Sequence, residues 1–119
     1  MSEKIKVYLV CPVRNCSEEV KKQLEDYVLV LETLGYDVHF PPRDVEQDQS
    51  GFNICDEHRK AMKECDEVHF WWDSESKGSH FDFGMAFMLE AFKPVKYVMA
   101  EEIKETPHKS YGNVIRYLS

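Results

Sequence analysis

The chain alternates between short apolar runs and longer segments in which apolar residues recur every three or four positions. The apolar runs are rich in β-branched and aromatic residues, which is typical of strands buried in a sheet. Strands are predicted over residues 5–11, 36–40, 67–72 and 94–99. Helices are predicted over residues 18–34, 52–64, 81–92 and 111–118. Strands and helices therefore alternate along the whole sequence.

This alternation predicts right-handed strand-helix-strand units, which place their strands side by side in one parallel sheet. We expect a three-layer α/β domain of the Rossmann or flavodoxin-like kind, with four to five parallel strands and helices on both faces. The length suits a single domain, residues 1–119, around one core. Ligands of such sheets bind outside the carboxyl ends of the strands, so we expect a site among the loops there.

Capping and turn residues set the expected ends of the helices. Ser17 precedes two glutamates and is expected to cap the first helix, and Gly35 is expected to end it. The second helix carries His58 on its apolar face. The third is expected to begin near Phe81, so that Asp82 falls in its first turn. The backbone N–H groups of that turn would then keep the carboxylate ionised.

Polar residues gather in three loops expected at the carboxyl ends of the strands. The first covers residues 12–15, and the third covers 73–79. The second covers 41–44, where two prolines end the strand, and leads into a long polar connection over 43–50. In the third loop, Gly78 and Ser79 bring the backbone close to any ligand and are expected to contact the substrate. The third loop is therefore the most informative of the three.

Asp82 follows this third loop. An ionised carboxylate at the mouth of a cleft suits nucleophilic attack on a sugar carbon, or stabilisation of an oxocarbenium-like centre, as in retaining glycosyl transfer. One alternative stays open: Asp82 is only a helix-terminal acid, because acidic residues are common near the starts of helices.

The formal net charge of −7 argues against a surface that binds nucleic acid polymers, because such surfaces need a basic footprint. A single nucleotide is compatible with this charge, since one or two cations can hold one phosphate. No apolar stretch reaches the ~18 residues of a membrane span, and nothing resembles a signal peptide. We expect a cytoplasmic protein without membrane contact.

The four cysteines lack CxxC spacing and are expected to be free thiols. Two of them lie near histidines, Cys55 with His58 and Cys65 with His69. Neither pair has a matching second pair at zinc-site spacing. We therefore expect neither a metal nor a cofactor.

Residues 71–86 read Trp-Trp-Asp-Ser-Glu-Ser-Lys-Gly-Ser-His-Phe-Asp-Phe-Gly-Met-Ala and resemble the signature of the nucleoside 2-deoxyribosyltransferase family. That signature is a strand, an Asp, a Gly-Ser or Gly-Thr turn, an aromatic residue, an acid, one residue and Gly. Segments 6–14 and 65–68 also fit, so the resemblance spans roughly residues 5–100. It implies cleavage or exchange of the bond between a nucleobase and the sugar C1′, with the acid at the Asp82 position attacking C1′. The related 2′-deoxynucleoside 5′-monophosphate N-glycosidases use the same frame and transfer the sugar to water.

The resemblance also implies substrate contacts from the first two loops. Pro12 and Arg14 belong to the loop that grips phosphate in the N-glycosidases, where a guanidinium can pair with two phosphate oxygens. A solvated loop arginine is the alternative. The Arg43-Asp44 pair resembles a segment that borders the sugar pocket in bacterial and phage-like members.

The chain departs from the family at two positions. The family nucleophile is usually Glu, and Asp82 is one methylene shorter. The family often has an Asp in the second helix that helps to protonate the leaving base, and counting back from Asp66 puts His58 there. A histidine can supply a proton near neutral pH. The alternative is a core-facing histidine with a satisfied hydrogen bond.

Two further residues at the end of the third strand are candidates. Asp73 can orient a base or a sugar hydroxyl, or it can form the turn before Ser74. Trp71 and Trp72 are adjacent and therefore face opposite sides of the sheet. Only one of them can line the cleft and stack on a base, for which we expect Trp72, and the other packs in the core.

Two classes of function follow. The first is an N-glycosyl transferase or hydrolase whose partner is a small nucleoside or its 5′-monophosphate. The second is a non-catalytic nucleotide-binding or signalling module with the same cleft. The resemblance further implies a homo-oligomer, a dimer or larger, in which the tail 112–119 is a candidate to complete a neighbour's pocket. The sequence does not distinguish ribose from 2′-deoxyribose in the substrate. It also does not identify the base or the final acceptor.

Overall fold

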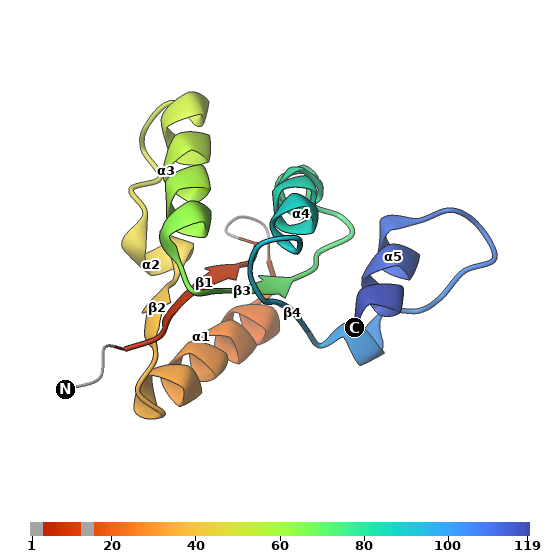
Figure 1. The fold of residues 1–119 in the computed structure, drawn as a ribbon, viewed down its shortest axis with the longest axis horizontal. Coiled ribbons are helices and arrows are strands. Elements are labelled where there is room, and N and C mark those ends of the chain that lie inside the picture. The colour runs from red at the N-terminus through yellow and green to blue at the C-terminus, as the bar shows by residue number, and fades with distance from the viewer. Residues whose placement is uncertain (1–3, 13–15) are drawn as a thin grey trace.

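The computed structural model describes residues 4–12 and 16–119. Figure 1 shows a sheet with helices on both of its faces. The elements in chain order are β1 (Lys6–Val10), α1 (Glu18–Thr33), β2 (Asp37–His39), α2 (Pro41–Asp44), α3 (Gly51–Glu64), β3 (Glu67–Trp71), α4 (Lys77–Leu89), β4 (Val95–Val98), the 3-10 helix η1 (Ala100–Glu102) and α5 (Tyr111–Leu118).

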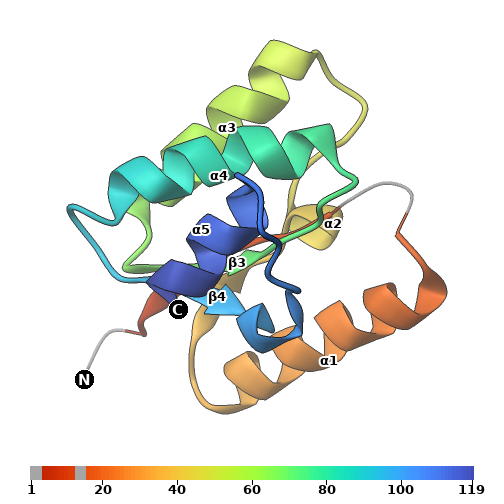
Figure 2. The same cartoon turned by 90° about the vertical axis from the view of Figure 1, so that its right-hand side faces the viewer.

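The sheet has four strands in the order β2-β1-β3-β4, and every neighbouring pair is parallel. α1 covers one face, while α3 and α4 lie side by side on the other, as Figures 1 and 2 show from two directions. α5 follows β4 and lies beside α4. This arrangement confirms the predicted three-layer α/β fold with a parallel sheet.

Alternate side chains of β1 separate the two halves of the core. Val7 and Leu9 are buried against α1, with Leu24 and Val28 of that helix. Tyr8 and Val10 face the layer of α3 and α4 instead. Because successive residues of a strand point to opposite faces, this strand has to be apolar at almost every position.

The ends of α1 follow the sequence signals. The Ser17 hydroxyl accepts a hydrogen bond from the N–H of Val20 at 3.1 Å, which satisfies one of the free donors of the first turn. Gly35 has a φ of +98°, a conformation that favours glycine after a helix. No helix of the described residues is both long and apolar enough to cross a membrane.

Pro41 and Pro42 were expected to open an irregular loop, but the structure places them at the start of the one-turn helix α2. Proline suits the first helical turn, where its missing N–H would have no partner and its fixed φ is already helical. The Asp44 carboxylate accepts the N–H of Phe40 at 2.7 Å and so closes the turn from its other end. The prediction of a loop from residue 41 was wrong for this reason.

Lys93 joins α3 to the segment after α4. Its Nζ donates to the backbone carbonyls of Met62 at 2.7 Å, Lys63 at 2.8 Å and Cys65 at 2.7 Å, at the end of α3. The last carbonyls of a helix have no partner within the helix and carry the negative end of its dipole. One ammonium group therefore caps α3 from outside.

We predict that Lys93→Met lowers the free energy of unfolding by about 2 kcal/mol, because three carbonyls lose a charged donor. Chemical denaturation with far-UV circular dichroism measures this change. Lys22→Met, on the exposed side of α1, is the matched control and is expected to stay within about 0.5 kcal/mol of wild type. Equal stability of the two variants would contradict the capping role of Lys93.

Candidate active site

Asp82 of α4 and His58 of α3 face each other between the two helices. The distance from His58 Nδ1 to Asp82 Oδ1 is 3.9 Å, and each side chain is 13% exposed. The sequence predicted both residues as catalytic, and the structure brings them together. A carboxylate and an imidazole at this separation can form an ion pair when the imidazole is protonated, or share one water or ligand atom.

Tyr8 lies below this pair in the central strand. Its ring is 6.0 Å from that of His58 and 5.1 Å from that of His39, with which it is stacked. Tyr8 and His39 are also register partners in neighbouring strands, which places them on the same face of the sheet. The four side chains therefore form one cluster, with Asp82 on the helical side of it.

The cluster holds polar atoms without partners. Among the residues that the structure describes, the buried Tyr8 hydroxyl and the buried Nε2 atoms of His39 and His58 have no hydrogen-bond partner. Unpaired buried polar atoms cost free energy and are uncommon in folded proteins. Three such atoms in one cluster indicate a place where water or a polar ligand supplies the missing partners.

Burial decides the protonation of two cluster members. It raises the pKa of the Tyr8 hydroxyl well above its usual range, and the charge of Asp82 acts in the same direction. Burial lowers the pKa of His39, against the opposing charge of Asp44. At neutral pH the hydroxyl keeps its proton and His39 is a neutral imidazole. The cluster can therefore both donate and accept hydrogen bonds.

The turn before α4 differs from the prediction. The helix begins at Lys77, and the Ser76 hydroxyl caps it by accepting the N–H of Ser79 at 3.1 Å. Gly78 and Ser79 thus belong to its first turn, and Asp82 falls in the second. The expectation that Asp82 falls in the first turn of this helix was therefore wrong, because the helix begins five residues before it.

Ser79 nevertheless orders the segment at the end of β3. Its buried hydroxyl accepts the N–H of Asp73 at 3.0 Å, and the Asp73 carboxylate accepts the N–H of Glu75 at 3.0 Å. Asp73 therefore acts as a turn-forming residue, which was the alternative for it. Its carboxylate keeps free acceptor capacity for a ligand.

Asp73 and Trp72 line a cavity of about 1150 Å³ on the α5 side of α4. The two tryptophans face opposite sides as predicted, since Trp71 packs with the α1 core and Trp72 with the other. The Trp72 ring lies 4.7 Å from that of His80 and 6.4 Å from that of Tyr111. Trp72 is thus part of an aromatic cluster, and its stacking on a base stays a prediction.

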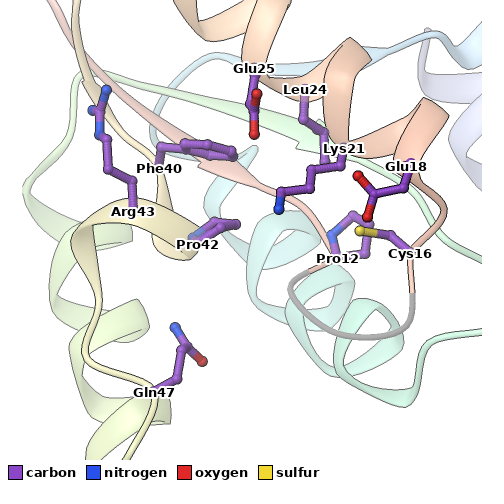
Figure 3. A pocket seen from close by; sticks show the side chains of 10 residues that line it. All are labelled: Pro12, Cys16, Glu18, Lys21, Leu24, Glu25, Phe40, Pro42, Arg43 and Gln47. Atoms are coloured by element: carbon purple, nitrogen blue, oxygen red, sulfur yellow. The ribbon is translucent and has the colours of Figure 1, made fainter.

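A second cavity, of about 470 Å³, lies beside the carboxyl ends of β1 and β2 (Figure 3). Pro12 and Arg43 line it, together with Lys21 of α1, whose side chain reaches into it. Arg14 lies outside the described residues. This cavity therefore keeps one of the two predicted phosphate-loop residues and adds a cation that the sequence analysis did not single out.

Arg43 and Asp44 have partners within the chain. The Arg43 guanidinium donates to both carboxylate oxygens of Asp44, to Glu32 and to the carbonyl of Val38. Burial would raise the pKa of Asp44, but its hydrogen bonds from Arg43 and from the Phe40 N–H outweigh this and lower it. The pair holds α2 against β2 and α1, and its contact with a substrate stays a prediction.

A third cavity, of about 620 Å³, opens between β2 and α3 and is lined in part by His39, Asp44 and Glu57. Neither Asp82 nor His58 lines any of the three cavities. Within the described residues, no group of three or more His, Cys, Asp or Glu side chains is placed to hold a metal ion.

The sequence analysis missed Tyr8 and His39. Both belong to strands and both are polar residues at positions that face the helical layer, between apolar neighbours. A polar atom at an inward position of a central strand is the signal that could have found them. Whether such an atom has a partner depends on distant residues, and only the tertiary structure shows that.

The solved structures similar to this chain include two enzymes. The CMP N-glycosidase BcmB of Clostridium botulinum aligns with 76% of this chain and 65% of its own, at 26% identity and a TM-score of 0.55. A 2-deoxyribosyltransferase of Bacillus psychrosaccharolyticus aligns with 94% of this chain and 91% of its own, at 20% identity and a TM-score of 0.60. The chain thus spans just under two thirds of the length of the N-glycosidase. Comparisons with family models and with curated proteins give no match.

These matches define the class of protein. The chain has the α/β fold of the nucleoside 2-deoxyribosyltransferase and N-glycosidase family, and the predicted resemblance to that family is confirmed. Asp82 lies in the segment 71–86, so the residue implied as the nucleophile is also the carboxylate of the buried cluster.

We predict that Tyr8→Phe leaves the free energy of unfolding unchanged or raises it by up to about 1 kcal/mol, because it removes a buried hydroxyl without a partner. Tyr27→Phe is the matched control, since the Tyr27 hydroxyl hydrogen-bonds His69 Nδ1 at 2.7 Å. It is expected to lose about 1 kcal/mol. Denaturant titrations of both variants make the comparison, and a loss in Tyr8→Phe equal to that in Tyr27→Phe would contradict the account of the cluster.

Proposed function

We propose that the protein cleaves or exchanges the N-glycosidic bond of a nucleoside or nucleoside 5′-monophosphate at the Asp82 and His58 pair. The observation that carries the proposal is the 3.9 Å approach of these two side chains beside three buried polar atoms without partners. The solved relatives, a CMP N-glycosidase and a 2-deoxyribosyltransferase, support the substrate class.

In the proposed reaction the Asp82 carboxylate forms a bond to C1′ as the bond from C1′ to the base nitrogen breaks. His58 gives a proton to the departing base, which leaves neutral. A water molecule or a second base then attacks C1′, breaks the bond to the carboxylate and gives its proton to His58, which restores the starting pair. Water makes the protein a hydrolase and a second base makes it a transferase, with the same first step.

The neighbours of Asp82 suit this chemistry. Tyr8 keeps its proton, because burial and the Asp82 charge both raise its pKa. Its hydroxyl can therefore donate to an oxygen of the sugar beside C1′. His39 is neutral and offers Nε2 as a second polar atom in the same layer. These contacts would fix the sugar while the carboxylate, one methylene shorter than in the family, reaches C1′.

The cavity at the end of β1 suits the 5′ side of the substrate. Pro12 lines it and the exposed Lys21 supplies a cation for phosphate. The phosphate contact of Arg14 stays a prediction from the sequence. Gly78, Ser79 and Asp73 would border the sugar and base from the turn before α4. The cytoplasmic location and the homo-oligomer stay predictions from the sequence.

The second candidate function is a nucleotide-binding module that has kept the cleft and lost the chemistry. The shorter acid and the histidine in place of the usual Asp favour it. Incubation with a panel of ribo- and deoxyribonucleosides and their 5′-monophosphates, with and without an acceptor base, separates the two. Release or exchange of a base supports the enzyme. Binding by calorimetry without any turnover supports the module.

We predict that Asp82→Asn lowers kcat by about 10³-fold or more, because the amide cannot form the bond to C1′. The substrate Kd and the Tm are expected to stay close to wild type, as the two side chains have nearly the same shape. Asp56→Asn is the matched control on the exposed side of α3, where Asp56 pairs with Arg59 and Lys60. If Asp82→Asn turned over substrate as fast as wild type, Asp82 would not be the nucleophile.

We predict that His58→Gln slows release of ordinary purine bases by about 10²-fold or more, the range of general acid catalysis. A 7-methylpurine leaves without needing a proton, because its nucleoside already carries the positive charge. The variant should therefore keep most of its rate on a 7-methylpurine nucleoside. Base release followed by chromatography measures both rates. An equal loss on the two substrates would show that His58 positions the site without donating the proton.

A further inference from the structure

Two cysteines stand at the carboxyl end of β1 and at the start of α1. Cys11 directly follows β1, and Cys16 directly precedes Ser17, the residue that caps α1. Four residues separate the two cysteines in the sequence. Both are partly buried free thiols in the structure. The reaction proposed at Asp82 uses neither thiol, so their own chemistry is a separate question.

Both cysteines lie on the same side of the sheet. Alternation along β1 places its odd-numbered residues on the α1 side, and Cys11 continues that series. Cys11 packs against the apolar cluster that contains Leu24 and Phe40. Cys16 lines the cavity of about 470 Å³ together with the same two residues (Figure 3). The two thiols therefore meet the α1 layer at the carboxyl end of β1.

The charge of one thiol affects the other. Burial raises the pKa of the Cys11 thiol, and the charge of Cys16 raises it further, ahead of the charge of Asp82. Coulomb energy falls with distance, so this effect agrees with two sulfur atoms that lie near each other. The raised pKa also keeps Cys11 protonated at neutral pH, so Cys11 is not the first of the two to react.

We propose that Cys11 and Cys16 form a reversible disulfide within one chain. The sheet holds the end of β1 and the Ser17 cap holds the start of α1, so both thiols belong to ordered parts of the fold. The bond would tie these two elements together beside the cavity that Pro12 and Lys21 also line. It depends on the two thiols alone and is independent of the proposed N-glycosidic chemistry.

A small disulfide of the glutathione disulfide class is the oxidant. The Cys16 thiolate, which borders the cavity, forms an S–S bond to one glutathione and displaces the other, which takes up the proton that Cys16 lost. The mixed disulfide removes the Cys16 charge that raised the pKa of Cys11. Cys11 then loses its proton and attacks the Cys16 sulfur, and the second glutathione leaves with that proton. The two cysteines lose two electrons, and glutathione disulfide gains them.

Peptide mapping tests the bond, because trypsin cuts after Arg14, between the two cysteines. The protein is incubated with glutathione disulfide, its remaining thiols are blocked with N-ethylmaleimide, and the chain is digested without reduction. A disulfide between Cys11 and Cys16 joins peptides 7–14 and 15–21. We expect the joined pair in most chains and its loss after dithiothreitol.

Cys16→Ser is expected to lose the joined pair. Cys55→Ser is the matched control, because Cys55 is exposed on α3, and it should keep the pair. In a non-reducing gel the oxidised wild type should run at the 14.0 kDa of one chain. Maleimide or glutathione on both Cys11 and Cys16 of the treated wild type would overturn the proposal. A joined pair found only in chains of twice that mass would also overturn it.

Thermal unfolding tests whether the fold suits the bond. A disulfide across a short loop removes chain entropy from the unfolded state, so oxidation is expected to raise the Tm of the wild type by about 5 °C. Cys16→Ser, treated in the same way, should show no such rise. An unchanged or lower Tm would mean that the bond strains the native backbone, which would overturn the proposal. Neither readout uses turnover, so failure of the proposed reaction at Asp82 would leave both results unchanged.

Discussion

The burial of β1 on both faces is the constraint on which the rest of the structure depends. Its odd residues, Val7 and Leu9, join the core with α1, and its even residues, Tyr8 and Val10, join the core with α3 and α4. Because alternation along a strand is fixed, each side chain from Val7 to Val10 belongs to one of the two layers. The Tyr8 hydroxyl, which β1 brings into the second layer, has no hydrogen-bond partner among the described residues. The candidate active site lies around this hydroxyl.

The cluster joins parts of the chain that are distant in sequence. β1 supplies Tyr8, β2 supplies His39, α3 supplies His58 and α4 supplies Asp82. The parallel register brings the first two together, and the packing of α3 beside α4 brings the last two together. Contacts such as the Lys93 cap hold the end of α3 and thus help to fix the helix that carries His58. Stability and site geometry therefore rest on the same few interactions.

The sequence predicted the strands and the parallel sheet, because these follow from the apolar runs. The resemblance to the family implied that Asp82 and His58 share one site. The sequence analysis missed the start of α4, since the Ser76 cap is a weaker signal than the Gly78-Ser79 turn that follows it. It missed α2, because two prolines at the end of a strand resemble a loop. The sequence also did not distinguish the buried Phe83 from the exposed Phe87. In a helix that is apolar on most sides, the hydrophobic pattern does not show which side is buried.

The central claim is that Asp82 forms a covalent bond to C1′, and the configuration of a trapped product tests it most directly. With methanol as the acceptor, two displacements at C1′ leave the sugar in its starting configuration, whereas a single displacement inverts it. Proton NMR of the product from a β-nucleoside is predicted to show the methyl β-glycoside, and Asp82→Asn is predicted to form none. A methyl α-glycoside as the first product would contradict the account.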